Sequence, residues 1–155
     1  MLKRFRRRVL KMFREFLVYH SSSLEFRAKV LTLVAASDHK ISECDEKILV
    51  KVAHQIYQNN RYRAELLIDT VHEYDTKIRT DNGLDFEHLI MQVEKDSQTT
   101  KRYVDKIDID VLNEFADCLE CEEDKIFHKR IIEFLEGLKS EHGKGENAKG
   151  ENGTV

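Results

Sequence analysis

The stretch Ser37-Asp38-His39-Lys40-Ile41-Ser42-Glu43-Cys44-Asp45-Glu46 separates an apolar run from an amphipathic one. A second stretch with the same layout follows 79 positions later, namely Ala116-Asp117-Cys118-Leu119-Glu120-Cys121-Glu122-Glu123-Asp124-Lys125. In each, one Asp follows the apolar run and another stands seven residues on, and each stretch opens a run with helical spacing. The apolar positions of these runs match pairwise, and they are Ile48, Val52, Ala53 and Ile56 in the first and Phe127, Ile131, Ile132 and Leu135 in the second. The sequence therefore predicts two related helix–turn–helix pairs.

The helices that flank the first turn carry clear local signals. The run 24–37 is apolar nearly all round, which is typical of a helix at the centre of a small bundle. Ser42 is the predicted N-cap of the next helix, which should end near Asn59-Asn60. Asp45, three residues after Ser42, is placed to complete a capping box by reaching back to the backbone amide of the cap.

Further helices are predicted on either side. Residues 61–79 continue helically, the turn Thr80-Asp81-Asn82-Gly83 follows, and Asp85 should cap a helix to about Glu94. A polar stretch, 95–100, separates it from a predicted helix over 101–119. The last helix should start near Glu122 and stop at Gly137-Leu138. Together with the N-terminal segment, this gives an all-α fold of about seven helices in a compact bundle.

The composition excludes several classes of protein. The chain has 155 residues, 41% of them hydrophobic and 35% charged, which suits a helical globular protein. It has no proline, and Gly83 is its only glycine before Gly137. Phosphate-binding loops and dinucleotide fingerprints need glycines where backbone approaches phosphate, so neither is predicted. No His-Glu-x-x-His motif or nucleophile elbow is present, and catalysis is not predicted.

Residues 1–20 form a predicted leader helix with one apolar and one basic face. The first fourteen residues hold seven cations and no acid. Such a helix can lie on an anionic membrane surface, dock on the core of its own domain or a partner's groove, or bind a nucleic acid, the last being disfavoured because no other basic patch exists. The predicted membrane- or partner-facing cations are Lys3, Arg4, Arg7, Arg8, Lys11 and Arg14.

The remaining boundaries follow from composition. Residues 21–139 form the predicted helical domain, and the Gly/Lys/Glu/Asn-rich segment 140–155 is a predicted disordered tail. The longest apolar-rich run, 28–36, is far too short to span a membrane. The three cysteines, Cys44, Cys118 and Cys121, form no disulfide framework in this prediction and fit a cytoplasmic protein. The leader would hold this protein peripherally at an inner membrane.

Ala36-x-Asp38-x-x-Ile41-Ser42-x-x-Asp45 resembles the Ala-x-Asp-Gly-x-Ile-Ser-x-x-Glu turn of the tellurite-resistance TerB-like family, and Ala116-Asp117 with Asp124 resembles its second turn. The resemblance implies an all-helical domain whose two turns approach to form an acidic surface. It also implies a role in stress or tellurite resistance with metal binding or sensing, in a module that is found fused to membrane anchors or to chaperone-recruiting J domains. Where the family's turns have Gly, this chain has His39 and Cys118.

The two turns are rich in carboxylates, which would repel one another unless a cation neutralised them. Hard cations such as Ca²⁺ or Mg²⁺ suit oxygen ligands, so the sequence predicts a divalent-cation site. The alternative is that these acids only cap helices and complement the helix dipole. Zn²⁺ is disfavoured because Cys118-x-x-Cys121 has no second cysteine pair. The predicted ligands are Asp38, Asp45, Asp117, Asp124, Glu120 and Glu123.

These observations predict a non-enzymatic binding or scaffold domain, serving stress or metal resistance if the family resemblance holds. The alternative function is a metal-free protein-interaction module that its basic N-terminal helix recruits to a membrane surface or a complex. The protein partner is not specified by the sequence. Five histidines are predicted to lie at surface or boundary positions, namely His20, His54, His72, His88 and His128.

Overall fold

The structure is a computed structural model that describes the backbone of residues 22–36 and 40–151 and the side chains of residues 23–36 and 40–142. The leader, with its six candidate cations, and Asp38 lie outside the described residues. Within them, every regular element is a helix, so the all-α prediction is confirmed. The elements are α2 (Ser22–Ala35), α3 (Glu43–Ile56), α4 (Arg61–Arg79), α5 (Phe86–Thr99), η1 (Lys101–Lys106), α6 (Ile109–Asn113), η2 (Glu114–Cys118) and α7 (Glu122–Glu151), where η denotes a 3-10 helix.

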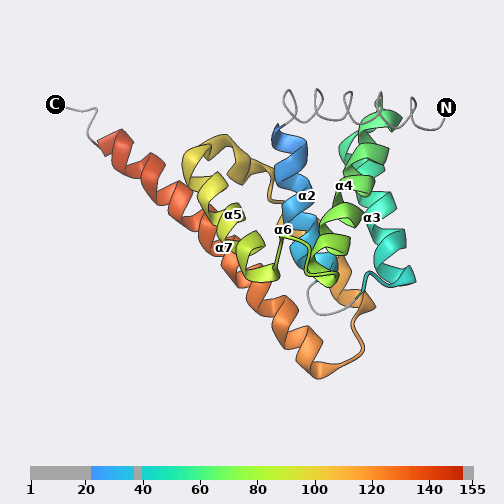
Figure 1. The fold of residues 1–155 in the computed structure, drawn as a ribbon. Coiled ribbons are helices and arrows are strands. Elements are labelled where there is room, and N and C mark those ends of the chain that lie inside the picture. Colours follow the sequence, from blue (N-terminus) through green and yellow to red (C-terminus); the bar gives the residue numbers. More distant parts are fainter. Residues whose placement is uncertain (1–21, 37–39, 152–155) are drawn as a thin grey trace.

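Helix α2 lies at the centre of the bundle, where α4, α5 and η1 pack against it and α3 and α7 also contact it (Figure 1). Its apolar residues are buried on all sides, as the sequence predicts. Lys29, one of its few charged residues, is satisfied by an ion pair of 2.8 Å between its Nζ atom and Oδ2 of Asp96 on α5. The ring of Phe26 stacks on Tyr103 of η1 with centroids 5.0 Å apart, which fixes the start of η1 against α2.

The matched apolar positions of the two predicted pairs contribute to one core. Val52 and Ala53 of α3 are buried, as are the equivalent Ile131 and Ile132 of α7. Leu135 is fully buried, and the other matched positions, Ile48, Ile56 and Phe127, are partly buried and pack against this core. Helical periodicity therefore identified the core-facing side of both helices.

Three helix boundaries differ from the prediction. Residues 101–119 are not one helix, because the backbone is extended at Ile107 and Asp108 then caps α6 by accepting a hydrogen bond from the Val111 amide. The Nζ atom of Lys139 on α7 donates to the carbonyl of Ile107, which satisfies the backbone at this break. The second predicted helix–turn–helix pair therefore has three short helices, η1, α6 and η2, in place of its first long helix.

Helices α5 and α7 are longer than predicted. Helix α5 continues through the polar stretch to Thr99, and α7 passes Gly137 and continues to Glu151. The predicted stop at Gly137-Leu138 is wrong because a glycine inside a helix costs only about 1 kcal/mol relative to alanine, and no proline enforces an end. The predicted disordered tail, 140–155, thus begins inside a helix in this structure.

Candidate functional site

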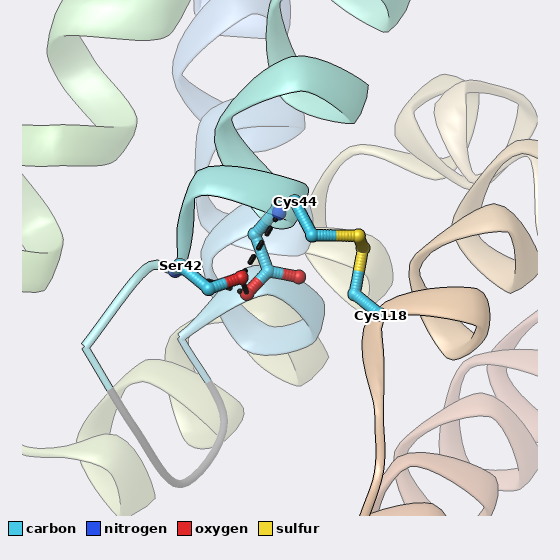
Figure 2. The surroundings of a disulfide bond; sticks show 4 residues. Ser42, Cys44 and Cys118 are labelled. Carbon is cyan, nitrogen blue, oxygen red and sulfur yellow. Dashed lines mark hydrogen bonds between the residues drawn. A yellow bond between two sulfur atoms is a disulfide. The ribbon is translucent and has the colours of Figure 1, made fainter.

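The two turns of the sequence meet through a disulfide bond. The Sγ atoms of Cys44, in the first turn of α3, and Cys118, the last residue of η2, are bonded, and the two Cα atoms lie 5.6 Å apart (Figure 2). The two cysteines are 74 positions apart in the sequence. The prediction that the cysteines form no disulfide is therefore wrong. Disulfides are typical of oxidising compartments, so the cysteine argument for a cytoplasmic location no longer holds.

The N-terminus of α3 has the predicted capping box beside this disulfide (Figure 2). The Ser42 Oγ atom accepts a hydrogen bond of 3.1 Å from the Asp45 backbone amide. The Asp45 Oδ2 atom accepts one of 3.2 Å from the Ser42 amide and one of 2.8 Å from the Ser42 hydroxyl. Ser42 and Asp45 thus satisfy each other, and one carboxylate oxygen of the candidate ligand Asp45 is already occupied twice. Because Asp45 is also buried, its role in this structure is to cap the helix.

The second turn presents its carboxylates to solvent. Asp117, Glu120 and Glu123 are exposed, and Asp124 is half-buried at the start of α7. Within the described part of the chain, the side chains of Glu120 and Glu123 form no ion pair. Acids in the first turn of a helix are favourable there because they face the unsatisfied backbone amides. Glu123 and Asp124, which lie in the first turn of α7, are therefore placed to stabilise that helix, whereas Asp117 and Glu120 precede it.

The predicted cation site has one member that the structure does not describe. Of the six candidate ligands, Asp45, Asp117, Asp124, Glu120 and Glu123 are described, and Asp38 is not. Among residues whose side chains are described, no three Asp, Glu, His or Cys side chains are arranged to hold a metal ion. The Ca²⁺ or Mg²⁺ site, which included Asp38, stays a prediction.

His128 of α7 is buried beneath this region, with 5% of its surface exposed. Its prediction as a surface or boundary residue is wrong, although the spacing contained the signal, because His128 shares a helical face with Ile131, Ile132 and Leu135. Neither ring nitrogen has a hydrogen-bond partner among the described residues. Burial lowers the pKa of His128, while the negative charge of Asp45 acts in the opposite direction. Burial therefore favours the neutral form of this imidazole over the charged form.

The remaining predictions about association concern the leader. No helix among the described residues is long and apolar enough to cross a membrane. The described residues contribute no observation on the membrane or partner surface assigned to residues 1–20.

The geometry of this end of the molecule is thus a capped helix, a disulfide and a set of exposed carboxylates. No protein-family model, curated protein or solved structure matches the chain. The resemblance to the TerB-like family therefore stays a prediction.

Proposed function

We propose that the protein is a non-enzymatic, metal-free interaction module that binds a basic segment of a protein partner through the surface around the two turns. We call this surface the acidic face, and it consists of the exposed residues Glu43, Asp117, Glu120, Glu122 and Glu123. The observation that carries the proposal is the Cys44–Cys118 disulfide. This bond joins covalently the turn that carries Glu43, on α3, to the turn that carries Asp117, on η2.

The disulfide fixes the relative position of these charges. Glu43 directly precedes Cys44 and Asp117 directly precedes Cys118, while the two Cα atoms of the disulfide are 5.6 Å apart. The disulfide thus makes the backbone at Glu43 a near neighbour of the backbone at Asp117. Exposed charges reinforce one another where they lie within the Debye length, which is about 8 Å at physiological ionic strength. An acidic surface of this kind attracts positively charged partners and sets their orientation, and it contributes more to association rate and specificity than to affinity.

The exposed carboxylates are available to a partner. Of the acidic face, only Glu122 forms an ion pair with another described residue, at 3.7 Å between its Oε1 atom and Nζ of Lys125. Asp45 is excluded from the face because its carboxylate is buried and caps α3. One acid of the two turns, Asp45, thus caps a helix, while the acids of the acidic face are exposed to solvent. This arrangement supports binding of a basic protein segment over binding of a single metal ion.

The biological setting rests on the sequence alone. The resemblance to the TerB-like family would place such a module in stress or tellurite resistance. The basic leader would recruit it to an anionic membrane surface or to a larger complex, through Lys3, Arg4 and the other cations of its polar face. Both are parts of the proposal that the acidic face does not depend on.

A labelled decalysine peptide tests the proposal by fluorescence anisotropy on the full chain. Glu120→Gln/Glu123→Gln removes two charges from the acidic face, and Glu133→Gln/Glu136→Gln removes two exposed charges from farther along α7. Exposed ion pairs contribute up to about 1 kcal/mol each, so the first variant should bind about three- to tenfold more weakly than the parent. The control should bind almost as tightly as the parent. Equal losses in the two variants would show that only net charge matters and would contradict a defined binding face.

A further inference from the structure

The chain has a third cysteine three residues after the disulfide. Cys121 is a free thiol and is exposed, while Cys118 is partly buried and Cys44 is exposed. Cys118 is therefore bonded to one cysteine across the two turns and is followed by another three positions later in the chain. Neither the proposed binding function nor the capping box uses Cys121.

We infer that the protein carries out an internal thiol–disulfide exchange, in which Cys121 replaces Cys44 as the disulfide partner of Cys118. The Cys121 thiolate attacks the Sγ atom of Cys118 and forms a new Cys118–Cys121 bond. The Cys44–Cys118 bond breaks, and its electron pair leaves on the Sγ atom of Cys44. The proton that Cys121 loses is balanced by the one that Cys44 takes up at neutral pH. One disulfide replaces another, so the step needs no external oxidant or reductant.

The backbone between the two cysteines permits their approach. The helix η2 ends at Cys118, where the Leu119 amide closes its last turn by donating a hydrogen bond of 3.1 Å to the carbonyl of Ala116, and the backbone of Leu119 is then extended. Leu119 and Glu120 have no helical structure, and a bend at Cys121 leads into α7. A disulfide requires Cα atoms within about 7 Å of each other, so the Cys118–Cys121 bond requires the two intervening residues, which no helix holds, to fold back on themselves. The short connection also gives Cys121 a high effective concentration at Cys118.

The exchange would change what the disulfide holds together. In the structure, the bond ties the N-terminus of α3 to η2, beside the capping box (Figure 2). A Cys118–Cys121 bond lies entirely within the second turn, so α3 and η2 would be held only by non-covalent packing. Cys44 would become an exposed free thiol at the first turn of α3. The inference concerns the covalent state of the turns and stands whether or not the acidic face binds a basic partner.

Mass spectrometry of the full chain, purified without reductant, tests the inference. One sample is held at about pH 8, near the pKa of a free thiol, and another at about pH 4, where thiols stay protonated. Both are then acidified and labelled with N-ethylmaleimide, and the label on each cysteine is quantified after digestion. In the sample held at about pH 4, we expect label on Cys121 alone. In the sample held at about pH 8, we expect at least about tenfold more label on Cys44, together with cross-linked peptides that contain Cys118 and Cys121.

Two comparisons make the result decisive. The rate at which label appears on Cys44 must not change when the protein is diluted, because exchange between molecules would depend on protein concentration. Cys121→Ser should remove the label from Cys44 while its circular dichroism stays that of the parent. In Cys44→Ser, oxidised glutathione should produce a Cys118–Cys121 bond, which checks the geometry even if exchange is slow. Label confined to Cys121 in the parent, a concentration-dependent rate, or failure of Cys44→Ser to form the new bond would overturn the inference.

Discussion

Cys44 and Cys118 are bonded to each other although 74 positions separate them. This bond brings together the two turns that the sequence marks as related, and it places Glu43 and Asp117, the residues directly before the two cysteines, at the same end of the molecule. The two related turns of the sequence are therefore covalently joined in the folded protein. The stability of the junction and the properties of that surface both follow from this covalent link.

Breaking the link should destabilise the domain. Cys44→Ser should lower the free energy of unfolding by about 2–4 kcal/mol, because the disulfide closes a long loop and restricts the unfolded chain. Urea denaturation under non-reducing conditions measures the loss. Cys121→Ser is the matched control, since Cys121 is exposed and unbonded, and it should change stability by less than about 0.5 kcal/mol. A loss in Cys44→Ser no larger than that of the control would mean that the bond contributes nothing to stability.

Asp45 should behave as a capping residue. Asp45→Ala removes the acceptor for the Ser42 amide and hydroxyl, and it should cost about 1 kcal/mol of stability. Glu43→Ala, in the same first turn but exposed, should cost less because it loses only interaction with the helix dipole. Thermal denaturation of both variants, with and without Ca²⁺ or Mg²⁺, makes the comparison. If either ion stabilised the parent but not Asp45→Ala, the carboxylate would be a metal ligand and the metal-free proposal would fail.

His128 should make stability depend on pH. Burial lowers its pKa in the folded state below the ordinary value of 6.5, so the unfolded chain binds more protons between these two values. The contribution of neutral His128 to the free energy of unfolding is therefore complete above about pH 6.5, and it is lost as the pH falls toward the pKa of His128 in the folded state.

His128→Leu tests this effect with a side chain that suits the surrounding Ile131 and Leu135. Between about pH 7.5 and pH 5, the parent should lose more stability than this variant, because only the parent has a histidine whose pKa is lowered by burial. Chemical denaturation at several pH values measures the difference, and His54→Gln serves as an exposed-histidine control that should retain the parent's pH dependence. Identical pH profiles for His128→Leu and the parent would show that His128 does not control this transition.

Local signals in the sequence were sufficient for much of the fold. Ser42, Asn60 and Asp85 cap α3, α4 and α5, and each lies at or beside a helix boundary that the sequence marks. Capping depends on residues three positions apart, so it can be read from a short segment. The break between η1 and α6 has no glycine or proline to mark it. It depends on Lys139, which reaches the Ile107 carbonyl from a distant part of the chain.

The candidate site was predictable only in part. The acidic character of both turns and the capping role of Asp45 could be inferred from composition and spacing. The pairing of Cys44 with Cys118 could not, because it is set by how α3 and η2 pack, and no local pattern reports that contact. The burial of His128 was within reach of the sequence, since it lies three and four positions before two core isoleucines, Ile131 and Ile132.

The leader should attach the protein to anionic surfaces. Each cation close to such a surface contributes about 1 kcal/mol, so the full chain should co-sediment with phosphatidylglycerol vesicles at low salt and be released by high salt. Arg7→Glu/Lys11→Glu should abolish sedimentation, whereas Lys95→Glu/Lys106→Glu, an equal charge change at exposed positions of the folded domain, should leave it intact. If the parent fails to sediment at low salt, recruitment to a membrane is excluded and binding of the leader to a protein partner is the remaining route.

The most direct test of the account is a disulfide map of the protein purified without reductant and acidified at once, using N-ethylmaleimide and digestion under non-reducing conditions. The account predicts that the dominant cross-linked species joins the peptides that contain Cys44 and Cys118, with the label on Cys121. Label on all three cysteines, or Cys118–Cys121 as the dominant pair, would contradict the joining of the two acidic turns.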